Sequence, residues 1–176
     1  VKYIHKNFPG MKELFFEDDT FTDNRARARE IAEKLKPLGL SWGCNAKVNV
    51  DYDTLKVMRD SGFRVVVAGF ETGSQKILTN IKKGTTVVGG AEFAKNCKKL
   101  GIHVHGTFIV GLPGETRETI RESMRYACDL DLGSIQVSLA APYPGTKFYD
   151  WAKTNGFLTQ DAMVSEVGYQ TCNVDY

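Results

Sequence analysis

The sequence of 176 residues lacks the features that would assign it to several classes of protein. No stretch reaches the ~20 consecutive apolar residues of a membrane-spanning helix, and the start, VKYIHKNFPGMKE, has no apolar middle like that of a secretory signal. Charge is balanced, with 23 Lys and Arg against 21 Asp and Glu, and Lys82-Lys83 is too short to mark a basic surface. We expect a cytoplasmic protein with no transmembrane segment and no nucleic-acid partner.

Cysteine is also scarce, and its four copies are scattered. Cys44, Cys97, Cys128 and Cys172 lie far apart in the sequence, and no CxxC or CxxxCxxC group is present to chelate a metal locally. We therefore expect buried, reduced thiols and no metal site made by the chain itself.

Apolar runs of strand length alternate with helix-like stretches along the whole chain. Strands are predicted at residues 13–17, 40–48, 63–70, 102–110 and 134–141, and helices at 24–36, 51–59, 75–81, 89–100, 116–130 and 147–153. Thr22-Asp23, Asp51 and Ser74 are candidate helix N-caps. This alternation predicts an α/β fold with right-handed crossovers and a parallel sheet, in one domain over residues 1–176. Both ends look cut, so we expect open sheet edges, half-covered apolar strands, and marginal stability or association.

Polar groups follow each predicted strand. In a parallel barrel the loops after the strands converge on one rim, where reactive groups gather. The strand ends carry Glu17-Asp18-Asp19, Asn45-Ala46-Lys47, Gly69 to Ser74, Gly111 to Glu115, and Ala141 to Thr146. Asp18 and Asp19 are candidates to bind an ammonium group or a metal, whereas Asp23 is expected to cap the next helix. Glu71 ends an apolar strand and needs a partner, either a lysine or a ligand hydroxyl or amine, because an unpaired buried carboxylate is costly.

The predicted strand at 102–110 has two different faces. Period-two alternation places Val104, Phe108 and Val110 toward the helices, and His103, His105, Thr107 and Ile109 toward the barrel interior. Without a third ligand nearby, the two histidines are expected to be satisfied interior side chains. The glycines of the following turn, GLPGE, let backbone groups approach a flat ligand closely.

Five strings in this order resemble the radical S-adenosylmethionine (radical SAM) enzymes: FFEDDTFT, NAKVNVDYDTLKVMRDSGF, GFETGSQKILTNIKKGTT, GTFIVGLPGET and APYPGTKFYDWAK. Within that family the resemblance is nearest to the branch with an N-terminal cobalamin-binding domain, and there to proteins associated with hopanoid biosynthesis. It covers nearly the whole chain and implies a partial, TIM-like parallel (β/α) barrel, of which this chain is units two to six. The first strand and the CxxxCxxC loop that holds a [4Fe-4S] cluster would then lie upstream of Val1.

The resemblance also implies roles for particular residues. Asp18 and Asp19 match the motif that contacts the methionine amino group, where many members carry Gly-Gly-Glu. Lys47 stands where many members have an arginine and would contact a carboxylate more loosely. Glu71, with Ser74 beside it, matches the position near the ribose and methionine. The remaining matches are to the adenine site: Gly111, Pro113 and Glu115 lie along the adenine, and Ala141 and Pro142 close it.

The implied chemistry is reductive cleavage of SAM to a 5'-deoxyadenosyl radical, with the cofactors carrying the reaction and the protein positioning them. It implies cobalamin in an upstream domain, an electron donor such as a flavodoxin or ferredoxin, contact with an upstream segment of the same chain, and a small-molecule or lipid substrate. The isolated chain is predicted to be inactive, because its scattered cysteines cannot replace a compact triad of cluster ligands.

Two other interpretations remain open. One is a non-catalytic piece that binds SAM or a nucleoside, or serves as a scaffold. The other is a barrel enzyme of aldolase or phosphate-binding type, which would show a Schiff-base lysine inside a strand or a glycine-rich phosphate loop. Neither of those signals is evident in the sequence.

Overall fold

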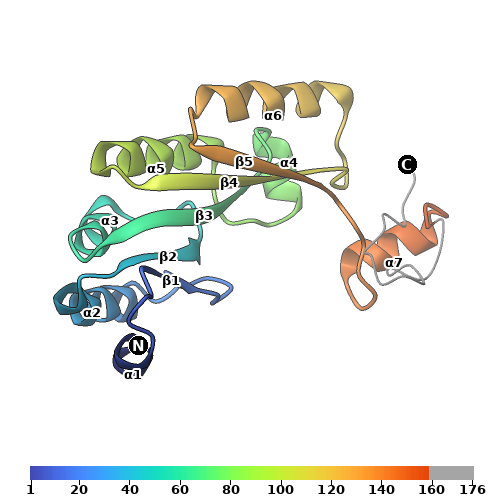
Figure 1. Ribbon diagram of the computed structural model, residues 1–176. Coiled ribbons are helices and arrows are strands. Elements are labelled where there is room, and N and C mark those ends of the chain that lie inside the picture. Colours follow the sequence, from blue (N-terminus) through green and yellow to red (C-terminus); the bar gives the residue numbers. More distant parts are fainter. Residues whose placement is uncertain (159–176) are drawn as a thin grey trace.

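The computed structural model describes residues 1–158, which form a parallel five-stranded sheet covered by helices on one face (Figure 1). The strands are β1 (Glu13–Phe16), β2 (Ser41–Ala46), β3 (Phe63–Glu71), β4 (His103–Val110) and β5 (Ser134–Leu139), adjacent in sequence order. The helices are α1 (Lys2–Asn7), α2 (Arg25–Leu35), the 3-10 helix η1 (Lys36–Leu38), α3 (Tyr52–Arg59), α4 (Gln75–Asn80), α5 (Val87–Leu100), α6 (Arg117–Asp129) and α7 (Lys147–Thr154). The predicted α/β fold with a parallel sheet is confirmed.

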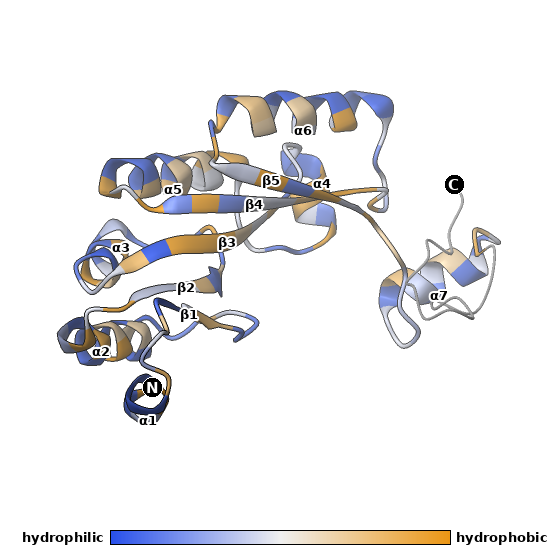
Figure 2. Ribbon diagram, in the orientation of Figure 1, coloured by the Kyte–Doolittle hydropathy of each residue, from blue (hydrophilic) through white to orange (hydrophobic). Residues whose placement is uncertain are grey.

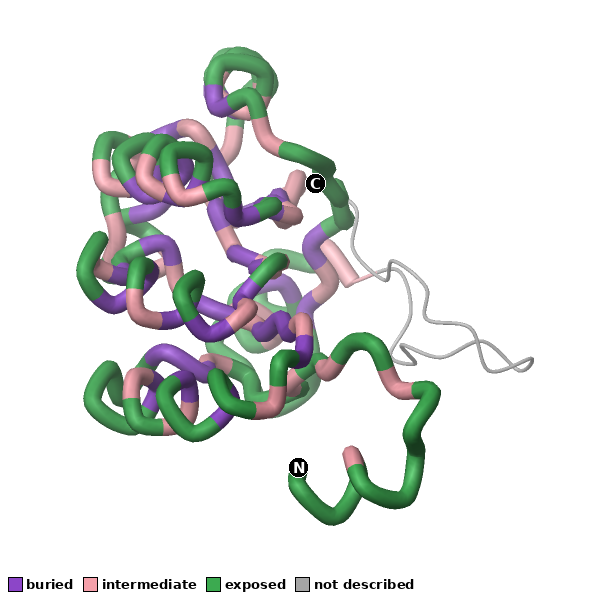
Figure 3. The backbone as a smooth tube through the Cα atoms, turned by 60° about the vertical axis from the view of Figure 1, so that its left-hand side comes forward, coloured by how far each residue is buried: buried purple, intermediate pink, exposed green. Residues whose placement is uncertain are grey.

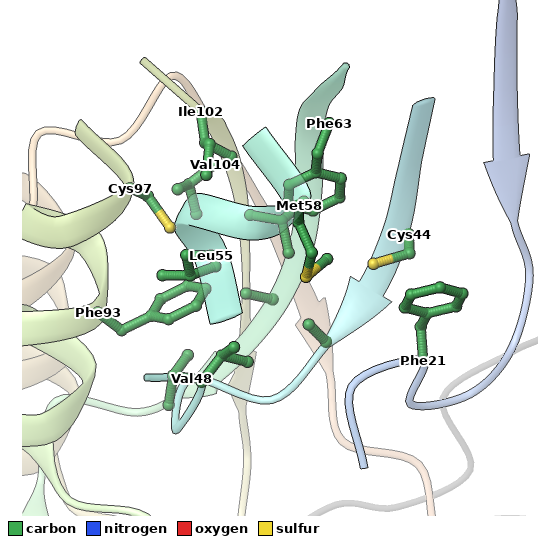
Figure 4. Packing of buried hydrophobic residues seen from close by; sticks show 14 of the residues in the cluster. Phe21, Cys44, Val48, Leu55, Met58, Phe63, Phe93, Cys97, Ile102 and Val104 are labelled. Atoms are coloured by element: carbon green, nitrogen blue, oxygen red, sulfur yellow. The ribbon is translucent and has the colours of Figure 1, made fainter. Parts of the chain in front are cut away.

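The main core lies between the sheet and the helices. Helix α3 begins at the Asp51 cap, whose side chain accepts the N–H of Thr54 at 2.8 Å, as the sequence predicted. Its apolar residues share one face, so that Leu55 lies toward Phe93 of α5 and Met58 toward β2 and β3 (Figure 4). Burial of one such side chain contributes about 1.5–3 kcal/mol. This packing fixes the strands, and with them the loops that follow them.

Strand β4 shows the two faces that the alternation predicted. Val104 and Phe108 are buried on the helix side. On the opposite face, the rings of His103 and His105 lie 3.3 and 2.8 Å from the hydroxyl of Ser134. Both histidines thus have a partner on the neighbouring strand, as expected, but His103 is exposed and His105 only partly buried, so the expectation of interior side chains was wrong for His103.

The outer face of β5 is only partly covered. Ile135, Val137 and Leu139 are 50%, 58% and 66% exposed, and Figure 2 shows apolar colouring along β5. Helix α6 lies over β4 and one side of β5, and most of α6 is exposed (Figures 1 and 3). The half-covered apolar strand expected from the sequence is therefore present. No helix in the described part of the chain is long and apolar enough to cross a membrane.

One predicted helix cap was wrong and another is confirmed only in its position. Helix α2 is capped by Asn24, which accepts the N–H of Arg27 at 3.0 Å, and neither Thr22 nor Asp23 takes that role. Ser74 occupies the N-cap position of α4 but makes no capping hydrogen bond through its side chain.

The expectation of buried thiols holds only in part. Cys44 and Cys97 are buried, whereas Cys128 is exposed on α6. Cys172 lies outside the described residues.

Candidate functional site

The ends of β1 and β2 are held together by hydrogen bonds that begin in the chain after β1. The backbone N–H of Phe21 donates to the carbonyl of Asn45 at 3.0 Å, and the Asn45 amide donates to the carbonyl of Asp18 at 3.3 Å. The Asp18 carboxylate lies 3.3 Å from Arg27, whose guanidinium also stands over the Phe21 ring at 5.5 Å. Asp19 is exposed. The two carboxylates proposed for an ammonium group therefore have different surroundings, and Asp18 already has a cationic partner.

Lys47 is also paired within this region. Its ammonium donates to the Asp23 carboxylate at 2.8 Å, and both side chains are well exposed. This hydrogen bond and the nearby charge lower the pKa of Asp23. Because an exposed ion pair is readily exchanged, this contact does not hold Lys47 firmly in one position.

Glu71 is the most constrained polar residue of the rim. It ends β3 at an irregularity in the pairing with β4, and its backbone φ of 64° lies in the left-handed region that residues other than glycine rarely adopt. The residue is 8% exposed, and its carboxylate is ion-paired with Lys83. Of the two partners that the sequence left open, the structure provides the lysine.

The segment after Glu71 is fixed to α6. The hydroxyls of Thr72 and Ser123 lie 2.8 Å apart, and the N–H of Gly73 donates to Ser123 at 2.9 Å. A Cβ at residue 73 would lie 2.7 Å from the carbonyl oxygen of Glu122, so only glycine permits this approach. These buried contacts hold Glu71 in place from its C-terminal side.

The turn after β4 is shaped by a carboxylate. Glu115 Oε2 accepts the N–H groups of Gly111 and Leu112 at 2.6 and 3.1 Å, and Gly111 has a φ of 88°. Pro113 lies within this turn and is partly buried. The other oxygen of Glu115, Oε1, is buried and has no hydrogen-bond partner among the described residues. Glu115 therefore stabilises the turn and keeps one acceptor unused.

The loops after β3, β4 and β5 pack against each other. The N–H of Ala140 donates to the carbonyl of Val110 at 2.7 Å, and the next two residues, Ala141 and Pro142, are partly and fully buried. A small second core joins these loops to α4 and α7, and it consists of Ile77, Leu112 and Ala140 with Ile81, Ile109 and Phe148 around them. The predicted rim residues thus fall into two groups, one after β1 and β2 and one after β3, β4 and β5.

The described residues do not fit a metal or an iron-sulfur cluster. Among residues 1–158, no group of three or more His, Cys, Asp or Glu side chains could hold a metal ion. Burial raises the pKa values of the Cys44 and Cys97 thiols to about 12, which opposes the thiolate form that cluster ligation needs.

Sequence reasoning missed the roles of Lys83 and Ser123, and it named Thr72 only as part of the strand end from Gly69 to Ser74. Lys83 is placed by the turn after α4, where Lys82 has a φ of 54°. No local pattern shows that this turn points back to β3. The available signal was indirect: a buried carboxylate at residue 71 demanded a cation, and Lys83 is one of the few lysines that follow it closely.

A sequence model described as the Radical SAM superfamily matches residues 1–127, and the chain belongs to this superfamily. An uncharacterized methyltransferase of Pyrococcus horikoshii is 40% identical over 161 residues, which are 90% of this chain and 35% of that protein. The hopanoid C-2 methylase of Rhodopseudomonas palustris is 26% identical over 157 residues, which are 84% of this chain and 30% of that one. The chain spans about a third of the length of these curated relatives.

A solved structure gives the same fold. TsrM from Kitasatospora setae, a radical S-adenosylmethionine methyltransferase solved with cobalamin and a [4Fe-4S] cluster bound, matches with a TM-score of 0.79. The match covers 93% of this chain and 34% of that chain at 18% sequence identity. The likeness shows that the described sheet is the partial, TIM-like barrel of radical SAM proteins.

Proposed function

We propose that residues 1–176 form one partial barrel domain that is the SAM-binding core of a radical SAM methyltransferase. The observation that supports this proposal most directly is Glu71, whose backbone is strained at the end of β3 and which is followed by the packed loops after β4 and β5. Strain of this kind persists where the surrounding structure enforces it, and it clusters at functional sites. The methyltransferase type is supported by what the relatives from Pyrococcus horikoshii and Rhodopseudomonas palustris are named for.

The residues of the rim fit a SAM molecule laid across the carboxyl edge of the sheet. Glu71, with Ser74 beside it, would accept hydrogen bonds from the ribose or the methionine amino group. Lys47 would leave Asp23 for the methionine carboxylate, and Asp18 and Asp19 would face the ammonium group. The turn from Gly111 to Glu115, with Pro113, would lie along the adenine, and Ala141 and Pro142 would cover it.

When bound, SAM supplies an activated methyl group and, together with a reduced cluster, radical chemistry. The chain's own contribution is to orient the cofactor and to exclude water with the packed loops. Pro142, which is fully buried, and the Leu112 cluster supply that apolar cover.

The cluster itself is proposed to be held by residues outside this chain, because the sequence has no CxxxCxxC and its described cysteines do not gather. Cobalamin and the contact for an electron donor such as a flavodoxin or ferredoxin are assigned to segments outside it as well. We therefore propose that the isolated chain is inactive. The hopanoid methylase relative supports a lipid of hopanoid type as the candidate substrate.

The proposal is tested by titrating the 176-residue chain with SAM in a calorimeter. We expect saturable binding, weakened about tenfold or more by Glu71→Gln, since a hydrogen bond to a charged group is worth about 1.5–3 kcal/mol. Glu13→Gln is the matched control, because Glu13 is also an ion-paired carboxylate, with Arg64, but lies at the opposite end of its strand. If the wild-type chain binds no SAM in this titration, the interpretation as a scaffold is favoured and the proposal fails.

A second assay tests the proposed inactivity. After iron-sulfur reconstitution, the isolated chain should release no 5'-deoxyadenosine from SAM under reducing conditions. Release above the level of a reaction without protein would contradict the assignment of the cluster ligands to residues outside the chain.

A further inference from the structure

The Glu71–Lys83 pair occupies space that the sheet leaves open for it. Residue 69 is glycine, and a Cβ there would lie 2.5 Å from Glu71 Oε1 and 3.1 Å from the Lys83 ammonium. Gly69 pairs with Thr107 of β4, on the face of the sheet turned away from the helices. The pair therefore lies over the interior face, where any larger side chain at residue 69 would displace it.

The backbone at both ends of the pair is held in an unusual conformation. Glu71 has a φ of 64°, and the two neighbours of Lys83, Lys82 and Gly84, have φ values of 54° and 71°. The N–H of Lys83 donates to the carbonyl of Leu78 at 3.1 Å, which ties the lysine to the end of α4. Left-handed conformations at L-residues are unfavourable, so the surrounding structure enforces this arrangement at two separate points.

We propose that Lys83 is a positioning residue that holds the Glu71 carboxylate in the orientation that receives SAM. This inference rests on the proposed function. Lys83 engages Oε1 of Glu71, so the ion pair restricts rotation of the carboxylate. Oε2 would then be held as the acceptor for the ribose or amino group of the cofactor. The ammonium also balances a carboxylate that is only 8% exposed and would otherwise be an isolated charge.

A purely structural ion pair would behave differently from a positioning one. Loss of a structural pair lowers the melting temperature and leaves the SAM affinity of the folded protein unchanged. Loss of a positioning residue lowers the affinity through Glu71, so removal of Lys83 has no further effect once Glu71 has been replaced.

The test is calorimetric titration of the 176-residue chain with SAM, with folding of each variant checked by circular dichroism. We expect Lys83→Met to weaken binding about tenfold or more, and Lys83→Arg, which keeps the charge and the donors, to stay within about threefold of wild type. Lys82→Met is the matched control, because Lys82 is exposed, precedes Lys83 directly and should bind SAM like wild type. Should Lys83→Met fail to fold, Lys83→Gln replaces it with the same expectation.

The double variant Glu71→Gln with Lys83→Met should bind no more weakly than the weaker of the two single variants. Unchanged affinity of a folded Lys83→Met protein, or fully additive losses in the double variant, would overturn the positioning role while the SAM-binding function stands. A wild-type chain that binds no SAM overturns the proposed function itself, and the role of Lys83 with it.

Discussion

The contact between the segment after β3 and helix α6 makes Gly73→Ala the sharpest test of how the site is built. A Cβ at residue 73 would lie 2.6 Å from the Cβ of Tyr126, 2.7 Å from the carbonyl oxygen of Glu122 and 2.8 Å from the Cα of Ser123. Carbon atoms in contact are normally about 3.5–4.0 Å apart, so the segment and the helix must separate by about 1 Å. That separation would break the hydrogen bonds of Ser123 with Thr72 and Gly73, now 2.8 and 2.9 Å long.

The expected cost follows from these contacts. Overpacking costs about 1–3 kcal/mol, and each lost hydrogen bond about 1 kcal/mol. We therefore expect Gly73→Ala, which combines overpacking with the loss of two hydrogen bonds, to lower the free energy of unfolding by about 3–5 kcal/mol, measured by urea denaturation followed by circular dichroism. SAM affinity should fall as well, because the segment that holds Glu71 from its C-terminal side has moved.

Gly10→Ala is the control for this experiment. Apart from its two neighbours in the chain, no residue lies within 4 Å of a Cβ at residue 10, so this variant should stay within about 0.5 kcal/mol of the wild type. The reasoning is refuted if Gly73→Ala is as stable as Gly10→Ala, since the close approach to α6 would then not constrain the segment.

Three further predictions concern the core, the thiols and a cap. In urea denaturation, replacing the buried Leu55 by Ala should lower the free energy of unfolding by about 2–5 kcal/mol. Val88→Ala, at a 77% exposed position, should lower it by under about 0.5 kcal/mol. Similar losses in the two variants would contradict the packing. Exposed Cys128 should react with a thiol reagent in the native protein, whereas Cys44, whose pKa burial raises to about 12, should react only on unfolding. Asp51→Ala should lower the free energy of unfolding by about 1 kcal/mol near neutral pH, because it removes the N-cap of α3. Burial alone would raise the pKa of Asp51, but the hydrogen bonds from Thr54 together with the charges of Arg29 and Arg25 lower it overall. Since the folded-state pKa is lowered, the deficit of this variant should shrink as the pH falls below about 4.

The regular elements were predictable because each depends on periodicity within a few neighbouring residues. Strand β3 was found from its β-branched run, and helix α3 from Leu55, Met58 and the Asp51 cap. The cap of α2 could not be predicted in this way, because Thr22, Asp23 and Asn24 are all good capping residues and the local sequence does not distinguish between them. In the structure Asn24 is the cap, and Asp23 is paired instead with Lys47, which follows the next strand.

The same distinction explains what could be predicted of the site. A parallel sheet brings the carboxyl ends of all its strands to one edge, so the polar residues of the rim could be named from the sequence alone. It could not say which of them are joined, because each pair depends on how a loop turns back. Arg27 meets Asp18 across the start of α2, and Lys83 meets Glu71 only through the left-handed turn after α4.

The two partners that the sequence allowed for Glu71 are compatible with each other. The cost of burying a carboxylate required a partner, and a lysine and a ligand were alternatives only as long as one contact was assumed to satisfy the whole group. A carboxylate has two oxygens with about four acceptor sites, and Lys83 engages Oε1 alone. In the proposed role, the lysine balances the charge and restricts the rotation, which would leave Oε2 as the acceptor for the ligand. A carboxylate without the lysine would have to be ordered by the ligand at a cost in affinity, so a built-in partner favours binding at this position.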